Sequence, residues 1–226
     1  MLIEIRDVYK IYGEGLESEV RALNGVSLKI DSGEYVAIVG PSGSGKSTLM
    51  NVLGLLDIPT YGRYFLKGEL VSELHDSKLA RVRNHEIGFI FQGFNLLNNL
   101  TALGNVELPL IYQGVRASKR LELAEDALKR VGLEHRMHHR PSEMSGGQQQ
   151  RVAIARAIAT RPSIIMADEP TGNLDSKTGA HVIEILRSLH SEGTTIILIT
   201  HDENIAGVAL RRVRVSDGKI AEDTAL

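Results

Sequence analysis

Several stretches of the chain alternate apolar and polar residues as half-buried strands do, whereas others are apolar almost throughout. LIEIRDV (2–8) and SLKI (27–30) belong to the first kind. YVAIVG (35–40), IIMAD (164–168) and TIILIT (195–200) belong to the second, which is typical of strands buried on both faces of a parallel sheet. The glycine-rich acidic stretch between the first two strands is expected to project into solvent as a turn.

Segments whose apolar residues have helical spacing lie between and beside these apolar runs. KSTLMNVLGLL follows the strand at 35–40, GAHVIEILRSLH (179–190) lies between the last two apolar runs, and 117–133 has apolar residues at helical positions. Buried strands that alternate with helices predict an α/β fold with a mainly parallel sheet. Residues 93–160 read as helix and loop, so they are expected to form a helical subdomain inserted between strand IGFIFQ (87–92) and strand IIMAD. The expected core comprises 1–92 and 161–226, and VRVSDGKIAED (213–223) is expected to form a hairpin that turns at Asp217-Gly218.

Composition narrows the class of protein. The 226 residues include 42% apolar residues and no cysteine, which fits a globular protein and excludes disulfides and thiolate metal sites. The 26 Lys and Arg balance the 28 Asp and Glu, so no basic footprint for nucleic acid is present. No window approaches 18 uninterrupted apolar residues, and the N-terminus MLIEIRDVYK is charged from residue 4, so neither a membrane helix nor a signal peptide is expected. We therefore expect a soluble protein that reaches a membrane only through a partner.

The stretch GPSGSGKST (40–48) matches the phosphate-loop pattern G-x-x-x-x-G-K-[ST] in its strand–loop–helix context. Its glycines allow backbone N–H groups to converge on phosphate oxygens, Lys46 would reach the β- and γ-phosphates, and the Ser47 hydroxyl would bind Mg²⁺. An accidental match is the weaker interpretation, because eight positions and both flanks agree. The predicted nucleotide contacts here are Gly40, Ser42, Gly43, Ser44, Gly45, Lys46, Ser47 and Thr48.

Acidic residues follow the apolar run at 164–168. Ligands of open α/β sheets lie beyond the carboxyl ends of the strands, so Asp168 is predicted to hold Mg²⁺ and Glu169 to accept a proton from an attacking water. His201 ends the next apolar strand and is predicted to contact the γ-phosphate or orient the water. The alternative is that these are solvated strand ends. The other histidines, including His135, His138 and His139, are interpreted as surface residues.

A second glycine pair, in MSGGQ (144–148), opens a helix, and helix N-termini bind anions. Taken in order, the phosphate loop, Gln92, SGGQ, IIMADEP, NLD and TH resemble the ATPase subunit of ABC transporters over the whole chain. The resemblance implies an ABC ATPase with a P-loop core, an antiparallel β subdomain and a helical subdomain. It implies that two copies pack head to tail, and that each SGGQ segment caps the ATP held by the other copy. Met144 departs from the family's usual leucine, with little expected effect.

The resemblance also implies roles for single residues. Ser145, Gly146, Gly147 and Gln148 would contact the opposite ATP, and Gln92 would contact Mg²⁺ and water. Asp175, in Asn173-Leu174-Asp175, lies in the loop that crosses the dimer interface. Tyr12 occupies the place of the aromatic residue that stacks on adenine, although Tyr9 is also plausible by spacing.

Longer stretches, including STLMNVLGLLDIPTYG and RPSEMSGGQQQRVAIARA, resemble the bacterial macrolide-efflux and lipoprotein-release branch. That branch implies a membrane permease with few transmembrane helices and a large extracytoplasmic domain, and a location on the cytoplasmic face of the inner membrane. Because this sequence stops at Leu226, it resembles the stand-alone arrangement. One alternative is an ABC ATPase that regulates cell-wall or division machinery through a membrane partner. A soluble ABC ATPase acting on nucleic acid or the ribosome is less favoured, since coiled-coil insertions and a duplicated cassette are absent.

Overall fold

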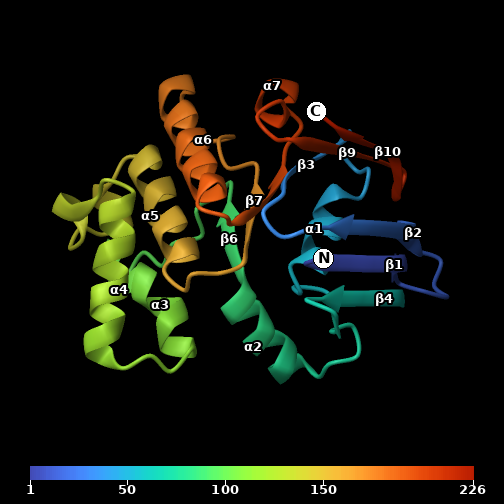
Figure 1. The fold of residues 1–226 in the computed structure, drawn as a ribbon, viewed down its shortest axis with the longest axis horizontal. Coiled ribbons are helices and arrows are strands. Elements are labelled where there is room, and N and C mark those ends of the chain that lie inside the picture. The colour runs from blue at the N-terminus through green and yellow to red at the C-terminus, as the bar shows by residue number, and fades with distance from the viewer. The chain divides into compact units, whose positions relative to one another are not determined.

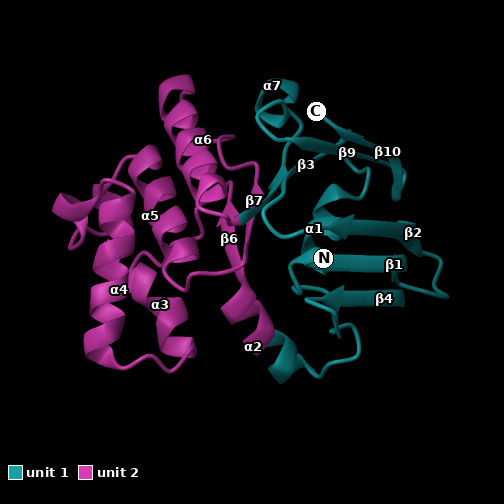
Figure 2. Ribbon diagram, in the orientation of Figure 1, with its two compact units in different colours: residues 1–80, 195–226 teal, residues 81–194 magenta.

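In the computed structural model, which describes residues 1–226, the chain divides into two units (Figure 2). The first comprises Met1–Ala80 and Thr195–Leu226, and the second comprises Arg81–Thr194. Each unit combines strands with helices, which confirms the predicted α/β class. Residues 81–92 and 161–194 belong to the same compact unit as the helical segment, and the predicted boundaries of a helical subdomain at 93–160 stay a prediction.

The first unit contains an antiparallel sheet in the order β2-β1-β4-β5. Alternation along β1 places Ile3 and Ile5 inside, where they pair with Ile30 and Leu28 of β2. Residues 13–19, between β1 and β2, are all exposed, as predicted. These strands span Ile3–Tyr12 (β1), Val20–Ile30 (β2), Tyr61–Leu66 (β4) and Glu69–Leu70 (β5).

A second set of strands in this unit has the order β10-β9-β3-β8. Every residue of β3 (Tyr35–Val39) and β8 (Thr195–Ile199) is buried, which agrees with their continuous apolar sequences. β9 (Arg211–Ser216) runs parallel to β3, and β10 (Lys219–Ala225) returns antiparallel after the predicted turn at Asp217-Gly218. Helix α1 (Lys46–Leu53) follows β3, and the short α7 (Glu203–Ala206) follows β8.

The second unit pairs β6 (Ile87–Phe91) in parallel with β7 (Ile164–Asp168). Helices α3, α4 and α5 pack against one another, and α5 also contacts α6 (Figure 1). Residues 93–160 contain only helices, 3₁₀ turns and loops, as predicted. The helices span Asp76–Glu86 (α2, across the division between the units), Ala102–Tyr112 (α3), Ala117–Arg130 (α4), Gly146–Ile158 (α5) and Ser176–Ser191 (α6).

Two predictions concern the length of the helices and the exposure of histidines. None of the helices is both long enough and apolar enough to cross a membrane. His135 and His138 are exposed and His139 is half-buried, which agrees with their interpretation as surface residues.

Candidate nucleotide site

The loop between β3 and α1 needs glycine at two points where the backbone has positive φ and other backbone comes close. Gly40 has φ 152°, and a Cβ atom there would lie 2.2 Å from the Val215 carbonyl oxygen. Gly45 has φ 105°, and its Cβ would lie 2.5 Å from the Ala22 carbonyl oxygen. A side chain at either position would displace backbone. The glycines therefore let the loop lie against β2 and β9.

The turn between β9 and β10 supports this loop. The Gly218 N–H donates a 2.9 Å hydrogen bond to the Ser44 carbonyl, and the Gly218 carbonyl accepts one of 2.8 Å from the Asn24 N–H. Ser44 is 4% exposed, and its hydroxyl has no hydrogen-bond partner in the protein. A buried hydroxyl usually finds a partner, so Ser44 offers a hydrogen bond to a ligand in the loop.

The N-terminus of α1 is open. Gly45 stands at its N-cap, no side chain caps it, and its first turn contains no acidic residue. The Lys46 ammonium donates 2.7 Å hydrogen bonds to the Gly40 and Pro41 carbonyls, so it bends back over the loop. Ser47 is exposed and Thr48 half-buried on the first turn. N–H groups without a side-chain cap, a lysine and two hydroxyls are groups suited to binding a phosphate.

Tyr12 ends β1 with 41% of its surface exposed, and its hydroxyl donates a 2.9 Å hydrogen bond to Asp57, which follows α1. Tyr9 points elsewhere, because its hydroxyl lies against Gly25 of β2. Burial, the hydrogen bond to Asp57 and its charge raise the pKa of Tyr12, and the Thr48 side chain acts in the opposite direction. Tyr12 therefore lies beside the first turn of α1, which favours it over Tyr9 as the base contact.

His201 lies at the carboxyl end of β8, in the same unit as the phosphate loop. β8 pairs in parallel with β3, with Ile199 opposite Ile38, and the Thr200 N–H bonds the Ile38 carbonyl at 3.2 Å. Parallel strands have their carboxyl ends at one sheet edge, so the exposed His201 is at the edge from which the phosphate loop departs.

In the second unit, Asp168 and Glu169 lie where β7 ends, and Gln92 follows its partner strand β6. Asp168 pairs with Phe91, so these residues share one edge of the strand pair. Asp168 and Glu169 are half-buried, and Glu169 has φ 44°, a strained conformation for a residue with a side chain. Such strain is often found at functional sites.

A contact that the sequence did not predict joins Gln92 to Asn173. The Gln92 side-chain amide donates to Asn173 Oδ1 at 3.2 Å, and the Asn173 amide donates to the Gln92 carbonyl at 3.0 Å. Gly172 leaves space for the Gln92 side chain, because a Cβ atom at position 172 would lie 2.6 Å from Gln92 Nε2. A residue predicted to contact Mg²⁺ and the loop predicted to cross a dimer interface are thus joined within one chain.

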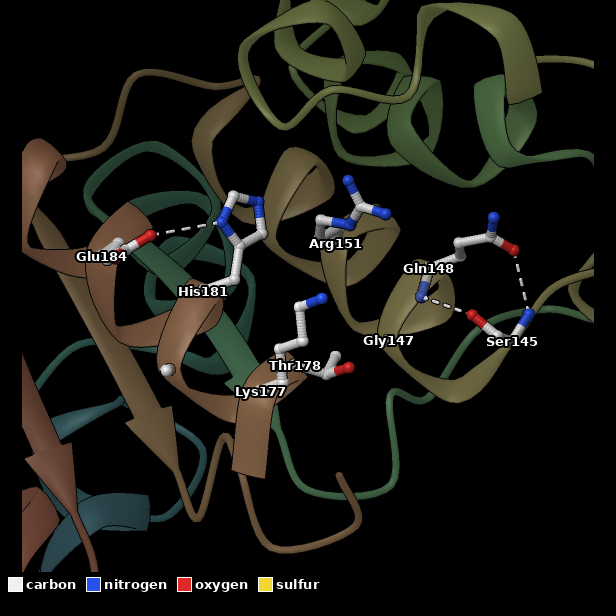
Figure 3. Close-up of a pocket in the computed structure, with 9 residues that line it drawn as sticks. Ser145, Gly147, Gln148, Arg151, Lys177, Thr178, His181 and Glu184 are labelled. Carbon is white, nitrogen blue, oxygen red and sulfur yellow. Dashed lines mark hydrogen bonds and ion pairs between the residues drawn. The ribbon is translucent and has the colours of Figure 1, made fainter. Parts of the chain in front are cut away.

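The SGGQ segment forms the N-terminus of α5 as a capping box. Ser145 Oγ accepts a 3.4 Å hydrogen bond from the Gln148 N–H, and Gln148 Oε1 accepts one of 3.0 Å from the Ser145 N–H. The capping geometry is drawn in Figure 3. Gly147 is packed so closely that a Cβ would lie 2.2 Å from the methyl carbon of Thr178 in α6.

Asp175 caps α6. Its carboxylate accepts hydrogen bonds from the Lys177 and Thr178 N–H groups at 3.1 and 3.0 Å, and from the Thr178 hydroxyl at 2.6 Å. The Thr178 hydrogen bonds lower the pKa of Asp175. The structure therefore gives Asp175 a role within its own subunit, and its contact with nucleotide stays a prediction.

A pocket of about 630 Å³ opens between the first turns of α5 and α6. Figure 3 shows Arg151, Lys177 and His181 around it, with Ser145 and Gln148 at one side and Glu184 at the other. Arg151, Lys177 and the N-terminus of α5 favour an anion in this pocket, whereas the Asp175 carboxylate already occupies the N-terminus of α6 and Glu184 adds a negative charge at the pocket edge. Arg151 is held in place by a 3.1 Å hydrogen bond to the Val131 carbonyl.

Comparison with known proteins identifies the family of the chain. Residues 23–172 match the family model described as ABC transporter. The chain is 55% identical to an ABC transporter ATP-binding protein of Thermotoga maritima over 97% of this chain and 93% of the relative. It is 54% identical to the macrolide export ATP-binding/permease protein MacB of Hyphomonas neptunium, of which it spans 34%.

The structure superposes on the dimeric ATP-binding cassette MJ0796 bound to ADP and Pi, with a TM-score of 0.91, 44% identity and coverage of 100% and 99% of the two chains. This likeness confirms the fold predicted from the motifs. The chain belongs to the ABC transporter family, and it is an ATP-binding cassette with the ABC-type ATP hydrolase fold.

Proposed function

We propose that this cassette hydrolyses ATP between two copies of itself, and that the cycle drives a membrane permease. The observation that carries the proposal is the presence in one chain of two separate anion sites, the open N-terminus of α1 and the basic pocket at α5 and α6. One site would hold the triphosphate, and the other would close over the triphosphate held by a second copy. The MJ0796 cassette, similar over its whole length, is described as dimeric.

The residues of each site have distinct roles in this proposal. The phosphate loop binds the phosphates through its N–H groups and Lys46, and Tyr12 stacks on the adenine. Glu169 accepts a proton from the water that attacks the γ-phosphorus, and the bond to the β–γ bridging oxygen breaks to leave ADP and phosphate. His201 contacts the γ-phosphate or orients the water. Ser145, Gly146, Gly147 and Gln148 contact the ATP of the other copy.

Three oxygen-bearing side chains are proposed to hold Mg²⁺: the Ser47 hydroxyl, the Gln92 amide and the Asp168 carboxylate. Hydroxyl, amide and carboxylate oxygens are ligands that Mg²⁺ accepts, and Ser47 is exposed on the first turn of α1. Bound Mg²⁺ neutralises phosphate charge, which assists departure of the γ-phosphoryl group.

The permease is proposed to have few transmembrane helices and a large extracytoplasmic domain, which would place the cassette on the cytoplasmic face of the inner membrane. Support comes from the 54% identity to a protein named as a macrolide export ATP-binding/permease protein. Efflux, lipoprotein release and force transmission share this arrangement, and the permease would select the cargo.

The test uses tagged Glu169→Gln with ATP and Mg²⁺ as bait in detergent-solubilised membranes of the host, with Lys46→Ala, which should not hold ATP, as the control. Mass spectrometry should identify a permease of the stated type that is enriched on the first bait. A cell-wall hydrolase regulator with no transport partner would favour the alternative function instead. Recovery of ribosomes or soluble proteins alone would overturn the membrane role.

A further inference from the structure

Lys10 and Tyr12 lie two residues apart on β1, so they share one face of the strand. The Lys10 ammonium is 5.1 Å from the centroid of the Tyr12 ring. A cation at this distance from a ring face is attracted to it. The Lys10 side chain is only 15% exposed, so water screens this interaction less than it would at an open surface.

Asp57 joins the two side chains. Its Oδ1 accepts a 2.5 Å hydrogen bond from the Lys10 ammonium, and its Oδ2 accepts one of 2.9 Å from the Tyr12 hydroxyl. The Ile58 carbonyl accepts a second bond from Lys10 at 2.9 Å. Burial would raise the pKa of Asp57, but its hydrogen bonds from Lys10, Tyr12 and the Ile58 N–H outweigh burial and lower it. The carboxylate is therefore charged at neutral pH.

The backbone fixes Asp57 with respect to both β1 and α1. Its N–H bonds the Asn51 carbonyl in α1 at 3.1 Å. Three residues later, the Thr60 N–H bonds the Tyr9 carbonyl at 2.8 Å, and the Thr60 hydroxyl accepts a 2.9 Å bond from the Ile11 N–H. Asp57 is thus held between the helix that begins at the phosphate loop and the strand that ends at Tyr12.

We propose that Lys10 and Asp57 are positioning residues for the nucleotide base. Asp57 fixes the orientation of the Tyr12 ring through its hydroxyl. The Lys10 ammonium lies over one face of that ring and leaves the other face to stack on adenine. This inference rests on the proposed function, in which Tyr12 stacks on the base. Aromatic faces carry negative potential and repel one another when stacked directly. A cation on one face reduces that repulsion, which strengthens stacking on the opposite face.

The test measures binding of Mg-ATP and of Mg-tripolyphosphate, which lacks the base, by isothermal titration calorimetry. Lys10→Met and Asp57→Asn should each weaken ATP binding about 3- to 10-fold. Tripolyphosphate binding should change less than about 2-fold in both variants, since neither residue contacts the phosphate loop. Lys29→Met, which alters a lysine of β2 in the same sheet, is the matched control and should affect neither ligand.

A double-mutant cycle separates positioning from a general effect on the fold. In a Tyr12→Leu background, Asp57→Asn should cause no further loss of ATP affinity, although it would still lower thermal stability. An equal loss of ATP affinity with and without Tyr12, or an equal loss of tripolyphosphate affinity, would overturn the inference.

The same binding measurements would give a different result if the proposed function itself were wrong. Folded wild-type protein that binds neither ATP nor tripolyphosphate would refute nucleotide binding itself. ATP binding that is unaffected by Tyr12→Leu would remove the base contact, and the positioning role with it, while leaving the phosphate site intact.

Discussion

Gln150 of helix α5 donates a 2.6 Å hydrogen bond from its side-chain amide to the carbonyl of Pro170, the residue that follows Glu169. Gln150 is fully buried, and its side-chain oxygen has no hydrogen-bond partner in the protein. The helix that begins with SGGQ is therefore tied directly to the segment that carries the proposed catalytic base.

Replacement of Gln150 by Leu should lower the free energy of unfolding by about 1–3 kcal/mol, because the Pro170 carbonyl loses its buried donor. Turnover should also fall, since the segment after Glu169 loses an anchor. Urea unfolding and steady-state ATPase assays measure the two effects. Asp126→Asn, at an exposed position of α4 in the same unit, is the control, and turnover of the Gln150 variant equal to that of this control would show that Gln150 does not support the catalytic segment.

Glu169→Gln should bind Mg-ATP with near wild-type affinity and hydrolyse it roughly 10²- to 10⁴-fold more slowly, because an amide cannot accept the water proton. Single-turnover hydrolysis and analytical ultracentrifugation with ATP measure the rate and the accumulated dimer. Glu125→Gln, in helix α4 of the same unit and outside the pocket, should keep full activity. Wild-type turnover in Glu169→Gln would remove this residue from its role.

Ser145→Arg should leave nucleotide binding by the monomer intact and prevent the ATP-bound dimer, because a long charged side chain would fill the contact surface. Since Ser145 also caps α5, the substitution should cost about 1 kcal/mol of stability. Ser145→Asn retains a capping side chain and serves as the stability control. Ultracentrifugation in the Glu169→Gln background measures dimer formation, and loss of ATP binding by the monomer would show that SGGQ acts within its own subunit.

Gly147→Ala should destabilise the fold, because its Cβ would lie 2.2 Å from the Thr178 methyl carbon. Thr178→Ser removes that methyl and keeps the hydroxyl that bonds Asp175, so the double variant should recover most of the lost stability. Thermal unfolding of the two single variants and the double variant tests this. Additive losses would show that the contact with Thr178 is not the cause.

Acid should weaken the cap of α6. Because the pKa of Asp175 is lowered in the folded state, its contribution to stability is present above the unfolded-state pKa and is lost as the pH falls through the folded-state pKa. Asp175→Asn should therefore flatten the decline of stability at acidic pH. Urea midpoints measured from pH 6 downwards compare the variant with wild type, and parallel curves would contradict the role of this cap.

Elements with a single strong pattern could be predicted from sequence, whereas those with mixed patterns could not. The apolar runs at β3, β7 and β8 gave boundaries within about one residue, and helices α4 and α6 followed their periodicity. Helix α3 contains Pro109, and it buries Asn105 completely against Leu97, so its apolar pattern is interrupted. Burial of a polar residue depends on a tertiary partner that local sequence does not show.

The residues of the candidate site likewise include some that sequence could predict and some that it could not. Motifs identify the phosphate loop and SGGQ because adjacent residues supply their geometry. The contacts of Lys10 with Asp57 and of Gln92 with Asn173 join residues 47 and 81 positions apart. Only the folded chain brings such pairs together.

The contact of Gly218 with the phosphate loop has a consequence for synthesis of the chain. The N-terminal part emerges first during translation, but the loop lacks its Gly218 support until all elements except β10 have been made. A nascent chain would therefore complete its nucleotide cradle only as translation of this segment ends. ATP would then act as a folding ligand that favours chains in which the turn between β9 and β10 has been made over shorter ones.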